Sequence, residues 1–213
     1  DTATREALDT INPDRAKLGN VSVLKDSVVK ITFTGADSLD IFAYEVRHKR
    51  VDSAFRLIRQ VRFDTAGGRY TVYDTTATRS EQLCYQVLTK DSCLNIVSSD
   101  TLCAVQLEGR PGNKQNQLRW DAFRGKPNPR YQVQRKQGGT WQTVGQTTDT
   151  SLTDSTDMAC QVTQSYRILT TFVGSADTSY SDTLQLTPFD TTAPPRQDLH
   201  FASAQTQGEV KVE

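Results

Sequence analysis

Hydrophobic and polar residues alternate along most of the chain in short runs, which is the pattern of β-strands with one buried face. One run ends at Ile31 and Phe33, and the next begins at Tyr44, eleven residues after Phe33. The same spacing separates Trp120 from Tyr131. Two runs with the same aromatic spacing predict that the chain contains an internal repeat.

Each copy contains about seven such runs, spaced roughly ten residues apart and separated by turn-forming residues such as Gly67-Gly68. No helical period is present. We therefore expect an all-β fold of two tandem seven-stranded antiparallel β-sandwiches. The last strand of each copy is expected to open with Ser99-Asp-Thr-Leu102 and Ser181-Asp-Thr-Leu184. The aromatic residues expected in the two cores are Phe33, Tyr44, Tyr85, Trp120, Tyr131, Trp141 and Tyr166. For Trp141, we favour core packing over a sugar-binding platform.

The matches between the copies predict four segments. Residues 1–13 are expected to be the end of a preceding repeat plus a linker, 14–105 the first sandwich, and 106–189 the second. Residues 190–213 align without a gap on residues 9–32, so they are expected to be a linker and the first strands of a truncated third repeat. Almost no linker separates the two sandwiches, which predicts a stiff joint. The Pro-rich segment after the second sandwich predicts a semi-rigid spacer.

The repeat resembles a fibronectin type III domain. The residues that carry the resemblance are Trp120, the Tyr131-x-Val-x-Arg135 strand and the Tyr85-x-Val and Tyr166-x-Ile strands. A narrower resemblance is to the repeats of large Bacteroidetes surface proteins associated with gliding motility and type IX secretion. It rests on Leu83–Cys93, Ser99–Cys103 and the Asp190–Pro195 linker. The resemblance implies a protein of the cell surface or the extracellular medium.

Asp is followed by Ser or Thr far more often than chance allows. This holds for 14 of the 19 Asp residues, although Ser and Thr make up only 43 of 213 residues. The pattern resembles the O-glycosylation sequon of secreted Bacteroidetes proteins. Turn chemistry is the alternative, because Asp, Ser and Thr side chains bond to nearby backbone groups, and both explanations can hold together. The candidate glycosylated residues are Thr2, Thr10, Ser27, Ser38, Ser53, Thr65, Thr75, Thr101, Ser155, Thr183 and Thr191.

Four cysteines are present, and folding the 83–89 strand back onto residues 100–105 sets Cys84 opposite Cys103. We therefore favour a Cys84–Cys103 disulfide, with Cys93–Cys103 as the main alternative. Cysteines in a Thr-rich β-protein also favour an oxidising, extracellular compartment.

Composition and charge make several functions unexpected. The formal net charge is zero and only two histidines occur, so neither nucleic-acid binding nor a zinc site is expected. No apolar run approaches the length of a membrane span, which is about 18 residues. Asp74 and Asp154 close equivalent strands and are interpreted as turn residues, and His48 as a structural residue. No catalytic residues, metal site or cofactor are expected.

The sequence thus predicts a non-catalytic structural or adhesive repeat array. Its expected partners are neighbouring repeats of the same chain, with self-association into a filament or surface layer and covalent glycans as further expectations. The alternatives are accessory modules of a secreted carbohydrate-active enzyme and a ligand-binding receptor ectodomain. A receptor would need exposed apolar residues on its loops, for which Phe42, Phe63 and Phe123 are the candidates.

Overall fold

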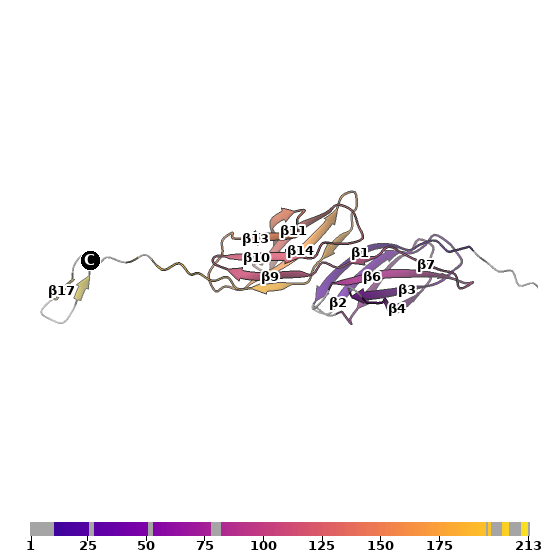
Figure 1. Cartoon of the computed structure of the whole chain (residues 1–213), viewed down its shortest axis with the longest axis horizontal. Helices are drawn as coiled ribbons and strands as arrows, with labels where there is room; N and C mark the ends of the chain where they lie inside the picture. The colour runs from indigo at the N-terminus through magenta and orange to yellow at the C-terminus, as the bar shows by residue number, and fades with distance from the viewer. Residues whose placement is uncertain are drawn as a thin grey trace, which may run out of the picture.

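The computed structural model describes residues 11–25, 28–50, 53–77, 82–194, 196, 202–204 and 210–212. Within these ranges the regular structure consists of β-strands, and two β-sandwiches follow one another along the long axis of the molecule (Figure 1). No helix in the described part of the chain is long and apolar enough to cross a membrane.

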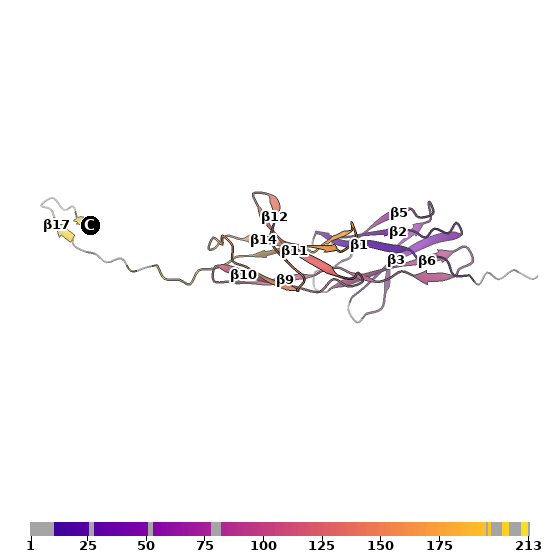
Figure 2. The same cartoon turned by 90° about the horizontal axis from the view of Figure 1, so that it is seen from above.

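The first sandwich contains eight strands in two sheets. One sheet has the order β1-β2-β5, and the other the order β4-β3-β6-β7, with β8 also pairing with β6. All pairs are antiparallel, and Figure 2 shows the two sheets as separate layers. The strands are β1 (Lys17–Lys25), β2 (Val28–Thr34), β3 (Ile41–Arg50), β4 (Arg56–Arg62), β5 (Arg69–Asp74), β6 (Leu83–Asp91), β7 (Ile96–Ser98) and β8 (Leu102–Cys103).

The second sandwich repeats this plan. Its sheets have the orders β9-β10-β13 and β12-β11-β14-β15, with β16 also pairing with β14. The strands are β9 (Leu107–Gly112), β10 (Gln115–Trp120), β11 (Pro129–Gln137), β12 (Thr140–Thr147), β13 (Ser151–Asp154), β14 (Gln164–Phe172), β15 (Thr178–Tyr180) and β16 (Leu184–Leu186). The all-β prediction of two tandem seven-stranded sandwiches is confirmed, because β7 with β8 and β15 with β16 are each one strand with an interruption.

That interruption corrects one expectation. The last strand of each copy starts before the Ser-Asp-Thr-Leu motif, at Ile96 and Thr178, and the motif breaks it. Val87 N–H donates to Ser99 Oγ at 2.9 Å, and Ile168 N–H donates to Ser181 Oγ at 2.8 Å. The buried serine hydroxyl thus supplies the hydrogen bond that a continuous backbone ladder would have supplied.

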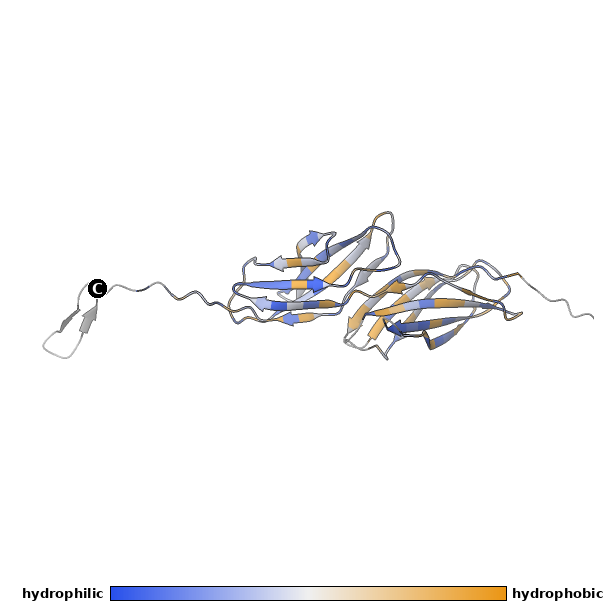
Figure 3. Ribbon diagram, in the orientation of Figure 1, coloured by the Kyte–Doolittle hydropathy of each residue, from blue (hydrophilic) through white to orange (hydrophobic). Residues whose placement is uncertain are grey.

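The cores follow from the alternation of residues along the strands, which Figure 3 shows as changes between hydrophobic and hydrophilic colours. The Tyr44 hydroxyl accepts a hydrogen bond from Ala36 N–H, and that of Tyr131 accepts one from Phe123 N–H, both at 2.9 Å. These buried tyrosines pack edge-on against Phe33 and Trp120, respectively. Six of the predicted core aromatics are buried: Phe33, Tyr44, Tyr85, Trp120, Tyr131 and Tyr166.

Trp141 is the exception. It is half-buried on β12 and does not belong to the core cluster of buried residues. The Arg167 guanidinium lies over its ring at 4.4 Å and over the Tyr180 ring at the same distance. Trp141 was expected in the core because it aligns with Phe55 of the first copy. Phe55 is itself only half-buried, under the Lys49 ammonium.

Two further strands, β17 (Ala202–Ala204) and β18 (Val210–Val212), form a hairpin. Ala202 pairs with Val212 and Ala204 with Val210. The first two strands of the chain pair Val21 with Ile31 and Val23 with Val29. The register is therefore the same in both hairpins once the alignment of residues 190–213 on residues 9–32 is applied.

Candidate functional site

The joint between the two sandwiches is the candidate functional site, because residues of the first sandwich contact residues of the second there. Cys103 N–H donates to Arg124 O at 3.1 Å, which adds a backbone bridge between β8 and the loop after β10. The Gln82 side-chain amide donates to Ala104 O at 3.0 Å and to Ala122 O at 3.3 Å. The backbone of the connecting segment is thus tied to both domains.

Gly125 allows a close approach at this joint. Its φ is +100°, and a Cβ atom added there would lie 2.1 Å from Thr101 O and 2.5 Å from Leu102 Cδ2. Any larger residue would have to push the second sandwich away from β8, since the nearest contact is backbone.

Next to Gly125, Lys126 bridges the two sandwiches. Its ammonium lies 2.6 Å from Asp177 Oδ2, lies over the Phe172 ring at 5.0 Å and donates to Gly19 O. The Lys126 side chain is 16% exposed and that of Asp177 is 27% exposed, so water screens this pair less than it screens an ordinary surface ion pair. Arg69 of the first sandwich lies 3.8 Å from the other Asp177 oxygen.

The edge strands β1 and β15 also lie together at the joint. Tyr180 N–H on β15 donates to Ser22 Oγ on β1 at 3.2 Å. Asp177, in the turn just before β15, lies beside Gly19 of β1. Each edge strand is therefore partly shielded from pairing with another chain.

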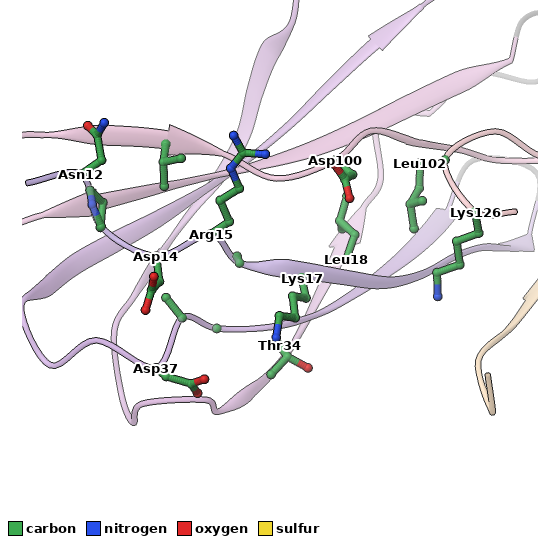
Figure 4. A pocket seen from close by; sticks show the side chains of 16 residues that line it. Asn12, Asp14, Arg15, Lys17, Leu18, Thr34, Asp37, Asp100, Leu102 and Lys126 are labelled. Carbon is green, nitrogen blue, oxygen red and sulfur yellow. The ribbon is translucent and has the colours of Figure 1, made fainter. Parts of the chain in front are cut away.

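A groove of about 830 Å³ opens beside this joint (Figure 4). Its walls come from β1 and the segment before it, from the loop after β2 and from the last strand, while Gly125 and Lys126 close one end. Charged lining residues balance, with three carboxylates and three cations: Asp14, Asp37, Asp100, Arg15, Lys17 and Lys126. In Figure 4 these side chains spread around the groove and do not converge on one point. Among the residues that the structure describes, no group of three or more His, Cys, Asp or Glu could hold a metal ion.

The segment after the second sandwich is held to it at first. Phe189 exchanges backbone hydrogen bonds with Gly112 and Lys114, at 3.1 and 2.8 Å. Thr191 N–H donates to Asn113 Oδ1, and the Lys114 ammonium lies 3.1 Å from Asp190 Oδ2. The Pro-rich linker is thus attached as far as Thr191, which shortens the segment available as a spacer.

Asp74 and Asp154 are more than turn residues. In the first sandwich, Asp74 Oδ2 lies 2.7 Å from His48 Nδ1 and accepts a hydrogen bond from the Tyr85 hydroxyl at 3.1 Å. In the second, Asp154 Oδ2 accepts hydrogen bonds from Arg135 at 2.8 Å and Tyr166 at 3.0 Å. Both carboxylates also accept a backbone N–H two residues on, from Thr76 and Thr156, as the turn interpretation expects.

These buried groups have shifted pKa values. Burial would raise the pKa of Asp74, but hydrogen bonds from Thr76 and His48 outweigh it, and the net pKa lies below its ordinary value. Burial raises the pKa of Tyr166 to about 12, and the Asp154 charge beside it acts in the same direction. Burial also raises the pKa of Tyr85, next to Asp74. In each sandwich a hydrogen bond from the buried tyrosine to the aspartate therefore joins the two sheets.

Cys84 and Cys103 form a disulfide, as favoured from the sequence, and this excludes the Cys93–Cys103 alternative. The two residues are directly paired between β6 and β8. Cys160 is an exposed free cysteine in the second sandwich.

The structure describes eight of the eleven candidate glycosylation sites; Thr2, Thr10 and Ser27 lie outside the described residues. Five candidates are exposed and three are half-buried: Ser53, Thr65, Thr75, Ser155 and Thr191 in the first group, Ser38, Thr101 and Thr183 in the second. At Asp74, Asp154 and Asp190 the carboxylate caps a backbone N–H two residues on, while the hydroxyl residue between them is exposed. Turn chemistry and an accessible hydroxyl therefore occur at the same positions.

Sequence reasoning missed the residues of the joint, namely Gly125, Lys126, Asp177 and Gly19. The one usable signal was the short connection between the domains, which predicted a stiff joint but not its contacts. Of the three candidate aromatics for a receptor surface, Phe123 does not qualify, since it is 4% exposed and packs edge-on against Phe172.

No family model matches this sequence, and no curated protein matches it either. Among solved structures, the crystal structure of the chicken CNTN1 FN1–FN3 domains is similar at 12% sequence identity and a TM-score of 0.33. The similarity covers 93% of this chain and 75% of that chain. The sandwich fold is established by the strand order and pairing of this chain itself.

Proposed function

We propose that this chain is a non-catalytic structural section of an extracellular repeat array, in which the joint holds successive sandwiches in one relative orientation. The observation that carries the proposal is the Lys126 bridge together with the close approach at Gly125. A freely hinged pair of domains would not need a positive-φ glycine packed on its neighbour's backbone, nor a lysine that is paired within its own domain and donates to a backbone carbonyl of the other.

We further propose an oxidising, extracellular setting with O-glycans on the exposed Asp-Ser and Asp-Thr sites. The Cys84–Cys103 disulfide supports the compartment, since such bonds persist outside the reducing cytosol. The exposed hydroxyls of Thr75, Ser155 and Thr191 support the modification sites. The resemblance to Bacteroidetes surface repeats supports a place in a surface structure of such a bacterium, with a structural or adhesive role.

In this proposal the array consists of sandwiches over residues 14–105 and 106–189, and residues 190–213 enter a third copy. The shared register of the β1–β2 and β17–β18 hairpins supports this division.

Distances between the two sandwiches test the spacer function. Spin labels on Arg59→Cys and Gln142→Cys, both exposed strand positions, would be placed in a Cys93→Ser/Cys160→Ser background. Pulsed electron resonance should give one narrow distance distribution. The Gly125→Val/Lys126→Ala variant should broaden it, whereas Lys136→Ala, an exposed lysine of the same domain, should not. A broad distribution in the parent protein would contradict the proposal.

A further inference from the structure

An exposed apolar surface lies at the end of the first sandwich that faces away from the second. It consists of Leu39, Phe42, Leu94 and Ile96, which are 83%, 59%, 77% and 49% exposed. We call these four residues the head surface. They account for four of the eleven large exposed hydrophobic side chains in the described part of the chain.

The head surface is one continuous piece of structure. Ser92 donates two hydrogen bonds to Asp40 O, from its backbone N–H and its hydroxyl, both at 3.0 Å. These bonds hold the loop of Leu39 against the turn of Leu94. Lys90 on β6 pairs with Ala43 on one side and with Ile96 on the other, so Phe42 and Ile96 lie at the same level on the two strands that flank β6.

The equivalent surface of the second sandwich is covered by the first sandwich. The two sandwiches can be aligned by the matching hydrogen bonds of Tyr44 and Tyr131. In this alignment Leu39 corresponds to Lys126 and Ser38 corresponds to Gly125. The turn of Leu94 precedes β7 as the turn with Asp177 precedes β15. Lys126 is 16% exposed under its neighbour, whereas Leu39 is 83% exposed. The head surface therefore has the position of a joint surface with apolar residues in place of the ion pair.

A second apolar surface lies at the other end of the molecule. Val162 and Phe189, which are 48% and 44% exposed, form this tail surface. They are adjacent because Gln161 N–H donates to Pro188 O at 2.9 Å. Figure 1 shows β7 near one end of the long axis and the chain leaving the second sandwich at the other.

We propose that the head surface docks the tail end of the second sandwich of another copy of this chain, so that copies associate head to tail. Opposed ends that fit each other make a heterologous contact, which does not close on itself as a two-fold dimer does and can extend into a filament. Burial of four large apolar side chains supplies the driving force. This proposal rests on the proposed function, because it assumes that two copies dock in the way that the two sandwiches meet at the joint.

Sedimentation of the full chain tests the proposal. The weight-average molar mass should rise about twofold or more between about 10 μM and about 1 mM, the range of weak, transient contacts. Leu39→Asp/Leu94→Asp should remove this rise. The control Leu57→Asp, which changes an apolar residue on β4 that is 56% exposed, should keep it. A constant molar mass for the parent protein, or an equal rise in the Leu39→Asp/Leu94→Asp variant, overturns the proposal.

A mixing experiment tests the head-to-tail geometry. The Leu39→Asp/Leu94→Asp variant keeps an intact tail, and a Val162→Ser/Phe189→Ser variant keeps an intact head. Each alone should stay monomeric, and an equimolar mixture should give dimers that grow no further. Dimers of the tail variant alone would show head-to-head contact and overturn the proposal. The spin-label distances within one chain should not change in either variant, so failure here is distinct from failure of the stiff joint.

Discussion

The Tyr85 hydroxyl donates a hydrogen bond to Asp74 Oδ2 at 3.1 Å, from β6 in one sheet to the end of β5 in the other. Tyr166 and Asp154 make the same bond in the second sandwich, at 3.0 Å. The third partner differs, since His48 stands where Arg135 stands in the second copy. Both copies thus have a buried carboxylate bonded to a phenol, and they differ in the third residue, which is His48 in the first copy and Arg135 in the second.

This exchange predicts unequal costs when the carboxylate is removed. Asp154→Asn leaves Arg135, whose side chain is 3% exposed, as an uncompensated buried charge, and should cost about 3–5 kcal/mol of unfolding free energy. Asp74→Asn should cost only roughly 1–3 kcal/mol, the cost of impaired hydrogen bonds, because no guanidinium lies beside this carboxylate.

Both tryptophans lie in the second sandwich, so urea unfolding followed by tryptophan fluorescence measures Asp154→Asn. Far-UV circular dichroism also reports the first sandwich and measures Asp74→Asn. Equal costs in the two variants would show that the cation is not what distinguishes the sites.

Acid should weaken the first sandwich through Asp74. Its folded-state pKa is lowered, so below the unfolded value of about 3.9 the unfolded chain binds more protons than the folded chain. The stabilisation is present above that pH and is lost as pH falls through the lower folded pKa. Glu45 acts in the same direction, because its ion pairs with Lys90 and Arg47 outweigh the effect of burial.

Urea midpoints followed by far-UV circular dichroism between pH 6 and pH 2 check this dependence, with the pH range chosen around that carboxyl pKa of about 4. Asp74→Asn should flatten the loss on the acid side. If the stability of that variant still falls as steeply towards low pH, the loss of stability is due to other carboxylates.

The disulfide should stabilise the first sandwich alone. Cys84 and Cys103 are separated by 19 residues, and closing a loop of that size stabilises by about 3 kcal/mol through the unfolded state. Cys84→Ala/Cys103→Ala should lose roughly that amount in far-UV circular dichroism and leave the tryptophan transition in place. Cys160→Ser, at an exposed position, is the control and should change stability by no more than about 0.5 kcal/mol.

Glycosylation should depend on the Asp that precedes the hydroxyl. In protein made by a glycosylating Bacteroidetes host, the peptide with Thr191 should carry added sugar mass, and Asp190→Asn should remove it. Asp190 and Thr191 are both exposed, so the substitution leaves the acceptor accessible. Gln185→Asn, an exposed change in the same region, is the control. Peptide masses equal to those of the bare sequence would leave turn chemistry as the explanation of the pattern.

The sequence predicted what strand alternation determines. The positions of Phe33, Tyr44, Trp120 and Tyr131 follow from the pleat, which sends alternate side chains to the core. The Cys84–Cys103 pair follows from a short turn between adjacent strands.

What the sequence did not predict depends on loop geometry and on pairs across strands. Trp141 lies outside the core, with the guanidinium of Arg167 from β14 over its ring. Lys126 and Asp177 come from two different loops of the second sandwich, and Lys126 reaches Gly19 O only because those loops contact the edge strand β1 of the first. Alternation within a strand carries no information on either contact, since both join residues far apart in the chain.

The stiff joint is tested most directly by residual dipolar couplings of the full chain in weak alignment. Amide couplings from β1–β8 and from β9–β16 should fit one alignment tensor, with the same magnitude and with the relative domain orientation of Figure 1. Two tensors of clearly different magnitude would mean that the sandwiches move independently, and would contradict the account.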